Sequence, residues 1–374
     1  MRRALATTLL ALAACAGPAQ TIPTGVFRAE RANTGAERYS AWFADSDGRV
    51  LYFGLSPFWE LWWQSDGDAR ADLEQPGDHL IGRFDLEAER FLEPLRVRRR
   101  APDVRSSVWD VLVHSNGRIY YTTYFEELGS VRPDGSDVRY FEGIGVGFNE
   151  LVEGPDQRIY ATRYSDAPAD PSLRSYGSVA VLAPEGALLR EFRFDAREGA
   201  FVAPKSLAVD PHRREIWLNT DTFMADGSVA HEWIRLSAEG EVLGRGTSPE
   251  VLFVAFDARG RGWFAEDAAG ELRLRIRERG AWTHTLSLGP RDALDFVQDI
   301  RFTAQGALLA LWSGRVISVE PGEGGFRVAD FRLELPPDCA PPESRSLLYT
   351  AVIHGEALYA TLFCGPTILR GQLQ

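Results

Sequence analysis

Short runs of alternating apolar and polar residues, separated by tight turns, make up most of this chain. The clearest example is VWDVLVHSNGRIYYTTY at residues 108–124. Asn-Gly between two runs rich in β-branched and aromatic residues is the strongest short-range signal of a β-hairpin. The stretch therefore predicts two antiparallel strands joined by a turn through Asn116 and Gly117.

The same hairpin pattern occurs seven times along the chain. The copies cover residues 41–54, 108–124, 149–163, 205–219, 252–266, 298–312 and 349–363. Most copies are followed by a second hairpin with a Gly or Pro-x-Gly turn, which is typical turn chemistry. The spacing between copies matches a repeating unit of four strands in about 40 to 50 residues, with insertions in some units.

Four-stranded units avoid open sheet edges by closing into a ring. After the last copy only residues 367–373 remain, which is enough for a third strand but not a fourth. Residues 24–31 precede the first copy and can supply the missing strand. We therefore predict an all-β fold: one β-propeller domain over residues 24–374, with seven four-stranded blades closed by an N-terminal strand. Six or eight blades are the alternatives.

Residues 24–374 resemble the NHL-repeat, SMP-30/gluconolactonase and virginiamycin lyase-like β-propellers through their recurring D/N-G-R-I-Y hairpins and P-x-G turns. In the gluconolactonase-like family, a Glu, an Asn and an Asp hold a metal in the channel. The resemblance places Asn149 and Asp221 where that Asn and Asp could sit. The opening Glu has no match, because the first copy begins Ser40-Ala41-Trp42.

The first twenty residues read as a targeting segment. Two arginines precede an apolar run over residues 4–14 that is too short to span a bilayer. The run ends in LAAC at Cys15, which resembles the lipobox of bacterial lipoproteins. It predicts a signal peptide at 1–14, a lipidated Cys15, a tether at 15–23 and a location on the bacterial cell envelope, at its periplasmic or outer-membrane face. Ordinary secretion, with cleavage near Ala19, is the alternative.

A formal net charge of -12 makes the surface repel phosphate backbones and anionic bilayers. We expect no nucleic-acid partner, contact with the membrane only through the lipid anchor, and a monomer. Export would place the two remaining cysteines in an oxidising compartment. A disulfide between Cys339 and Cys364 is therefore predicted.

Propeller geometry sorts residues between two faces. The turn between the first two strands of a blade lies on one face; the start of the first strand and the end of the second lie at the channel mouth on the other. The histidines are expected near the first turns or in outer strands, away from this mouth: His114, His212, His354, His79, His231 and His284. That placement weighs against a hydrolase or lyase that uses a histidine base.

Polar residues gather instead at the predicted channel mouth. Carboxylate and amide oxygens converging there would suit Ca²⁺ or another divalent cation. The candidate metal ligands are Asp110, Asn149, Glu150, Asp221 and Asp299. A polar channel that binds only water is the alternative interpretation.

Four further residues are candidate ligand-binding groups. Trp59 and Trp62 lie in an insertion expected to cross the channel mouth, either as a platform for a sugar or apolar ligand or as a loop packed by its own aromatics. Arg163 ends a second strand at the mouth. Lys205, the only lysine of the chain, is expected near the axis. A structural ion pair is its favoured role; a nucleophile or a ligand of a substrate carboxylate is the alternative.

Three functions fit these observations, the least favoured being a surface adhesion or assembly role carried by the ring itself. The favoured one is a binding or scaffold propeller, tethered to the envelope, that presents its channel mouth to a small molecule, a glycan or an envelope protein. The alternative, implied by the family resemblance, is a metal-dependent lactonase-like hydrolase or lyase acting on a small sugar-derived substrate.

Overall fold

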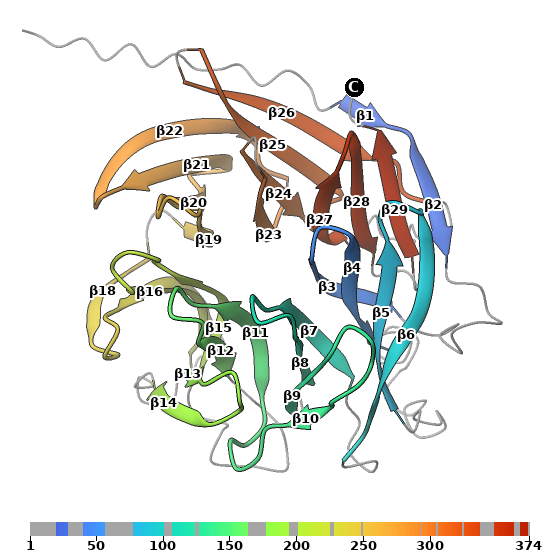
Figure 1. Ribbon diagram of the computed structural model, residues 1–374. Coiled ribbons are helices and arrows are strands. Elements are labelled where there is room, and N and C mark those ends of the chain that lie inside the picture. The colour runs from blue at the N-terminus through green and yellow to red at the C-terminus, as the bar shows by residue number, and fades with distance from the viewer. Residues whose placement is uncertain are drawn as a thin grey trace, which may run out of the picture.

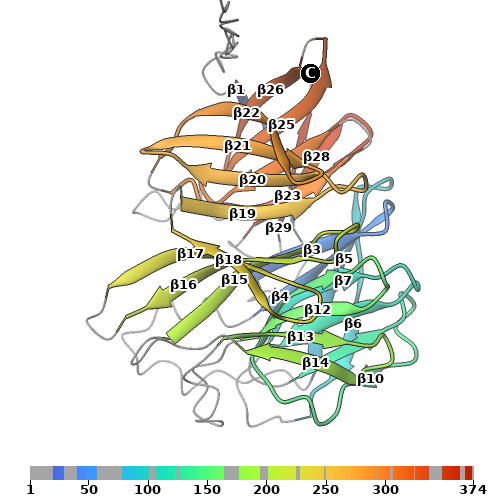
Figure 2. The same cartoon turned by 90° about the vertical axis from the view of Figure 1, so that its left-hand side faces the viewer.

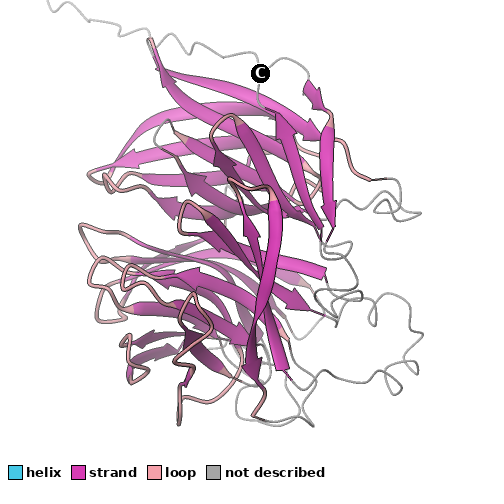
Figure 3. Cartoon of the chain, turned by 45° about the vertical axis from the view of Figure 1, so that its right-hand side comes forward, coloured by secondary structure: helices cyan, strands magenta, loops and turns pink. Residues whose placement is uncertain are grey.

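The computed structural model describes most of the chain as strands and turns (Figure 3). The described ranges are 20–28, 40–56, 78–100, 107–123, 127–163, 177–193, 201–224, 228–247, 250–292, 294–303, 306–323, 325–336, 348–362 and 367–372. None of these ranges contains a helix long and apolar enough to cross a membrane.

The strands form seven sheets, numbered here as blades one to seven in chain order. Blade one contains β3 (Ser40–Ser46), β4 (Val50–Ser56), β5 (Asp78–Asp85) and β6 (Arg90–Arg98). Blade two contains β7 (Val108–Val113), β8 (Ile119–Thr123), β9 (Leu128–Val131) and β10 (Arg139–Tyr140). Blade three contains β11 (Phe148–Glu153), β12 (Ile159–Arg163), β13 (Ser178–Leu182) and β14 (Leu188–Arg193). Blade four contains β15 (Phe201–Val209), β16 (Ile216–Phe223), β17 (Val229–Leu236) and β18 (Val242–Gly246).

The remaining blades follow the same order. Blade five contains β19 (Glu250–Phe256), β20 (Gly262–Asp267), β21 (Glu271–Glu278) and β22 (Ala281–Pro290). Blade six contains β23 (Val297–Phe302), β24 (Ala307–Leu311), β25 (Arg315–Gly322), β26 (Gly325–Leu333) and the added strand β1 (Gln20–Ile22). Blade seven contains β27 (Leu348–His354), β28 (Ala357–Leu362), β29 (Thr367–Gln372) and β2 (Thr24–Arg28).

The seven sheets stand around a common axis, with the first strand of each blade innermost (Figure 1). Seen from the side, the blades follow one another around the ring (Figure 2). The seven-bladed β-propeller predicted from the hairpin repeat is therefore confirmed, and six blades are excluded.

The N-terminal strand closes the ring as predicted. Strand β2 pairs antiparallel with β29, from Thr24 opposite Gly371 to Arg28 opposite Thr367. Strand β1, within the stretch assigned to the tether, adds a parallel fifth strand to β26, which the sequence did not predict. Figure 1 shows β1 and β2 (blue) beside strands from the C-terminal part of the chain (orange and red).

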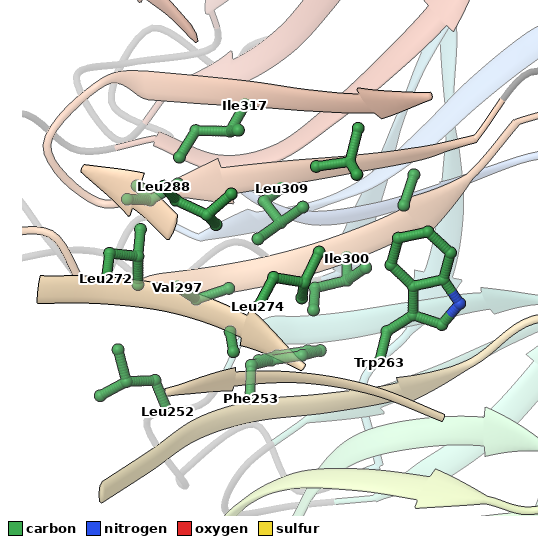
Figure 4. Close-up of a cluster of buried hydrophobic side chains, with 14 of the residues drawn as sticks. Leu252, Phe253, Trp263, Leu272, Leu274, Leu288, Val297, Ile300, Leu309 and Ile317 are labelled. Atoms are coloured by element: carbon green, nitrogen blue, oxygen red, sulfur yellow. The ribbon is translucent and has the colours of Figure 1, made fainter. Parts of the chain in front are cut away.

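Each junction between neighbouring blades has its own cluster of buried apolar side chains. Figure 4 shows the cluster between blades five and six, where Trp263 and Leu274 of blade five meet Ile300 and Leu309 of blade six. Alternation along each strand supplies this packing, because successive side chains point to opposite faces of the sheet. The hydrophobic core is thus divided into seven clusters, one between each pair of neighbouring blades, arranged around a central channel.

Every innermost strand also carries a register shift near the channel mouth. At such a β-bulge an extra residue has no partner in the neighbouring strand, so its side chain is redirected. The residues skipped by the pairing are Trp42 and Phe43, Trp109, Asn149 and Glu150, Lys205, Leu252, Gln298, and Tyr349 and Thr350. The bulges therefore bring aromatic, polar and charged residues together around the axis.

Candidate binding site in the central channel

A cavity of about 1100 Å³ runs along the axis of the ring. It reaches from Asn219 and Asp221 at the mouth to Gly154 and Asp257 in turns of the opposite face. The innermost strands of blades one to seven all contribute residues to its wall. A volume of this size is at the upper end of those typical for small-molecule sites.

One side of the channel is built from aromatic rings brought together by the bulges of blades one, two and seven. The ring of Trp42 stacks on Tyr349, with centroids 5.2 Å apart, and lies 4.3 Å from the ring of Trp109. Phe43 and Trp312 complete this cluster around Tyr349. Phe43 and Trp109 line the cavity, so one part of its wall is aromatic.

A charged cluster centred on Arg301 also lines the cavity. Within β23, Arg301 Nε donates to Asp299 Oδ2 at 2.7 Å. Its Nη1 and Nη2 reach blade one, donating to Asp45 Oδ1 at 2.7 Å and to the backbone oxygen of Ala44 at 2.6 Å. Burial opposes the charge on Arg301, but Asp299 and Asp45 outweigh that effect and raise its pKa. Arg301 thus links blade six to blade one past blade seven.

Asp110 uses its carboxylate to join blades two and three. Its two oxygens accept the backbone N–H groups of Val111 in its own strand and of Leu151 in β11, both at 2.8 Å. Burial raises the pKa of Asp110 to about 7, although these hydrogen bonds and the charge of Arg301 act in the opposite direction. Asp110 is therefore a buried acid with a structural role at the channel wall.

Glu150, on the adjacent blade, is differently placed. The backbone N–H of Leu207 in β15 donates to its carboxylate, whereas Oε2 is buried and has no hydrogen-bond partner among the described residues. Burial and the nearby charges of Asp110 and Asp299 raise the pKa of Glu150 well above its usual value. Beside it, the hydroxyl oxygen of Ser206 is also buried and has no hydrogen-bond partner in the described part of the chain. Both residues line the cavity.

Blade four extends farther toward the mouth than the hairpin pattern predicted, since β15 begins at Phe201 and β16 continues to Phe223. On this extension Asp221 lies opposite His231 of β17, and its Oδ1 shares a hydrogen bond with His231 Nδ1 at 2.7 Å. Both residues line the cavity. The prediction that no histidine stands at the channel mouth is therefore wrong for His231.

The five candidate metal ligands are only partly brought together. Asp110, Glu150 and Asp299 interact electrostatically at the cavity wall, with Asn149 beside Glu150, whereas Asp221 pairs with His231. Within the described ranges, no three His, Cys, Asp or Glu side chains are grouped as ligands of one ion. The charge that offsets Asp299 and Asp45 comes from Arg301, whose guanidinium lies between them. These residues, as arranged here, do not fit a Ca²⁺ site.

Of the four candidate ligand-binding residues, the structure describes the side chain of Arg163 alone. Arg163 is buried; its Nη1 donates to Glu191 Oε1 and its Nε to the backbone oxygen of Val146, both at 2.8 Å, and it is not part of the cavity lining. Lys205 stands at the bulge of β15, but its side chain is outside the described part of the structure, as are Trp59 and Trp62. Cys15, Cys339 and Cys364 also lie outside the described residues.

Arg301, its partner Asp45 and the aromatic cluster were not predicted from the sequence, although Asp299 was. Arg301 and Asp299 share a strand face because they are two residues apart, which was a usable signal. Asp45, which accepts a hydrogen bond from Arg301, is 256 residues away from it in sequence, so no local pattern predicts that contact. The aromatic cluster had a signal in the large side chains at the start of the first strands, but a hairpin pattern alone does not show that these positions are bulges.

No protein-family model and no curated protein matches the chain. Solved structures match its fold at 10 to 12% sequence identity. A chain of the mitotic checkpoint complex aligns with a TM-score of 0.58 over 100% of this chain and 99% of that one. The β-propeller domain of Myceliophteria thermophila Cps50 (Swd1) gives 0.56 over 94% and 100%, and YCF48 bound to D1 peptide gives 0.51 over 95% and 98%. These likenesses support the propeller fold alone.

Proposed function

We propose that this chain is a lipid-anchored protein of the bacterial envelope whose propeller binds a ligand in its central channel. One observation carries the binding role: the cavity of about 1100 Å³ is lined by two buried polar atoms, Glu150 Oε2 and Ser206 Oγ, that have no hydrogen-bond partner among the described residues. Buried polar atoms are normally paired, so such atoms in a cavity wall favour a ligand site. The LAAC sequence ending at Cys15 supports the anchor.

The fold is suited to binding a partner at its axis. Seven separate interblade cores hold the wall, so a channel residue can be chosen for its contacts with a ligand rather than for the stability of the ring. YCF48, which shares this fold, was solved with a bound peptide. The Arg301 cluster does not favour the alternative of a metal-dependent lactonase-like hydrolase, because its guanidinium lies where the acids would have to meet a cation.

Thermal unfolding with a panel of compounds tests the proposal. The panel contains short alkyl diamines, neutral mono- and disaccharides, and small carboxylates. We expect at least one class to raise the melting temperature of the full chain in a saturable way. The change Val152→Trp, which fills the cavity from blade three, should abolish that rise.

Val352→Trp, which fills the same cavity from blade seven, provides a second variant if the first does not fold. Saturable stabilisation that survives both cavity-filling changes would place binding outside the channel and contradict the proposal. Absence of stabilisation by every class in the panel would also contradict it.

A further inference from the structure

Glu150 and Ser206 form a pair of unsatisfied polar groups at the junction of blades three and four. They are neighbours, because the backbone N–H of Leu207, the residue after Ser206, donates to the Glu150 carboxylate. Ser206 is only 2% exposed, yet its hydroxyl has no hydrogen-bond partner in the described structure. An unpaired buried polar group destabilises a structure, so a ligand that donates hydrogen bonds here would remove that cost.

The charge of the wall indicates the kind of donor. Asp110 and Glu150 line the cavity, and neither forms an ion pair with a cation of the described residues. Arg301, whose charge lowers the pKa of both acids, is already bonded to Asp299, Asp45 and Ala44. Burial raises the pKa of both acids, because it disfavours their charged forms. A cationic ligand beside Glu150 would favour the charged form and supply its counter-ion.

The aromatic part of the wall offers apolar contacts beside the acidic groups. Phe43 and Trp109 line the same cavity, and Trp42 and Tyr349 pack behind them. Aromatic faces attract cations and also cover alkyl groups. Trp109 belongs to the blade next to Glu150, so a ligand of moderate size can contact both.

Resting on the proposed channel-binding function, we propose that the ligand enters this site with a primary ammonium group. The ammonium donates hydrogen bonds to Glu150 Oε2 and Ser206 Oγ, and the alkyl chain that carries it lies against Phe43 and Trp109. An ammonium has three donors and no acceptor, which matches two unpaired acceptors in an acidic wall. A neutral sugar would satisfy the hydrogen bonds but leave the negative charge without a counter-ion. The same group occurs in a free diamine and in a lysine side chain of a peptide.

Isothermal titration calorimetry of the full chain with three probes tests this inference. The probes are 1,4-diaminobutane, the peptide acetyl-Gly-Lys-Gly-amide and the uncharged analogue 1,4-butanediol. We expect at least one amine probe to bind and the diol not to bind. Binding of the diamine identifies a small-molecule source, and binding of the peptide alone identifies a peptide source.

Glu150→Gln should weaken amine binding about tenfold or more, because hydrogen bonds to charged groups contribute more than neutral ones. Ser206→Ala should weaken it to a smaller extent. Glu153→Gln is the matched control: Glu153 lies on the same strand and lines the same cavity, but its oxygens accept hydrogen bonds from Ser115. It should change affinity less than about twofold.

Equal loss in the Glu150 and Glu153 variants, or no loss in the Glu150 variant, would overturn the inference. If sugars or carboxylates bind in the channel and both amine probes fail, the ammonium inference is wrong while the proposed binding function stands. If no probe of any class stabilises the protein, both fall.

Discussion

Arg301 donates hydrogen bonds to Asp299 within β23 and to Asp45 and Ala44 of blade one. Its positive charge therefore offsets the two carboxylates in this part of the channel wall. The change Arg301→Met would leave two carboxylates without their partner. About a third of its side-chain surface (33%) remains accessible, so we expect a loss of about 3 kcal/mol in unfolding free energy, the lower end for buried ion pairs. Urea unfolding measures it.

The matched control is Arg327→Met. Arg327 is 77% exposed and faces Glu320 at 3.5 Å, so its removal should cost about 0–1 kcal/mol. Equal losses in the two variants would show that Arg301 is not a central ion-pair partner of the channel wall.

Glu150 makes the stability of the protein depend on pH. In the folded state its pKa is raised well above the usual 4.5, so the folded chain keeps a proton that the unfolded chain has released. Stability from this group is therefore present at low pH and is lost as the pH rises above about 4.5 through the folded pKa. Asp110, whose pKa is raised to about 7, acts in the same direction.

The variant Glu150→Gln isolates that contribution, because Gln is neutral at every pH. We expect its unfolding free energy to match that of the wild type near pH 4 and to exceed it increasingly toward pH 8. Urea unfolding of both proteins across this range gives the difference. A difference that is constant with pH, or that declines as the pH rises, would contradict the raised pKa.

At the scale of elements, the closing strand β2 depends on one aromatic contact. Phe27 packs on Phe84 of blade one, with ring centroids 5.2 Å apart, and so joins the N-terminal strand to the first blade as well as to the last. We expect Phe27→Ala to lower the unfolding free energy by about 2–3 kcal/mol, less than for a fully buried Phe because Phe27 is only partly buried. Chemical unfolding measures the loss.

Val26 offers a control on the same strand. It is 40% exposed and points to the other face, so Val26→Ala should cost about 0.5 kcal/mol or less. If both variants lose the same amount, β2 contributes by its backbone pairing alone, and the aromatic contact does not stabilise the closure.

The elements themselves were largely predictable from the sequence. Hairpins are encoded locally, by Asn-Gly, Asp-Gly or Pro-x-Gly turns between alternating runs, and their spacing predicted the seven blades. The short last copy predicted closure by residues 24–31, and β2 confirms it. Strand β1 was not predicted because its partner β26 is remote in sequence and its three residues carry no pattern of their own.

The candidate site was predictable only in part. Aligning the copies placed Asp110, Glu150 and Asp299 at the channel, because the start of each first strand has one position relative to the axis. It did not place His231, since the length of the β15–β17 extension cannot be counted from turns alone. Arg301 was missed because its contacts cross from blade six to blade one, and such contacts depend on how the ring closes.

At the scale of the whole molecule, the proposed lipid anchor at Cys15 precedes the strand β2 that closes the ring. In a bacterial host, the full chain should sediment with the membrane fraction, and Cys15→Ala should release it into the soluble fraction. Fractionation followed by immunoblotting measures this distribution. Wild type and variant in the same fraction would contradict a lipid attached to Cys15 and favour ordinary secretion.

We propose that the channel, rather than the outer edges of the blades, is the binding surface of the molecule. Seven interblade cores stabilise the ring, and the bulges of the innermost strands turn aromatic and acidic side chains toward the axis. The described residues of that wall include more acids than cations, which is the reason for proposing a cationic ligand there.

A crystal structure of the full chain with 1,4-diaminobutane tests the proposed binding site most directly. We expect electron density for the diamine inside the channel, with one nitrogen within hydrogen-bond distance of Glu150 Oε2 and Ser206 Oγ and the alkyl chain against Trp109. Diamine bound only on the outside of the ring, or a channel holding water alone at a concentration that saturates binding in solution, would contradict it.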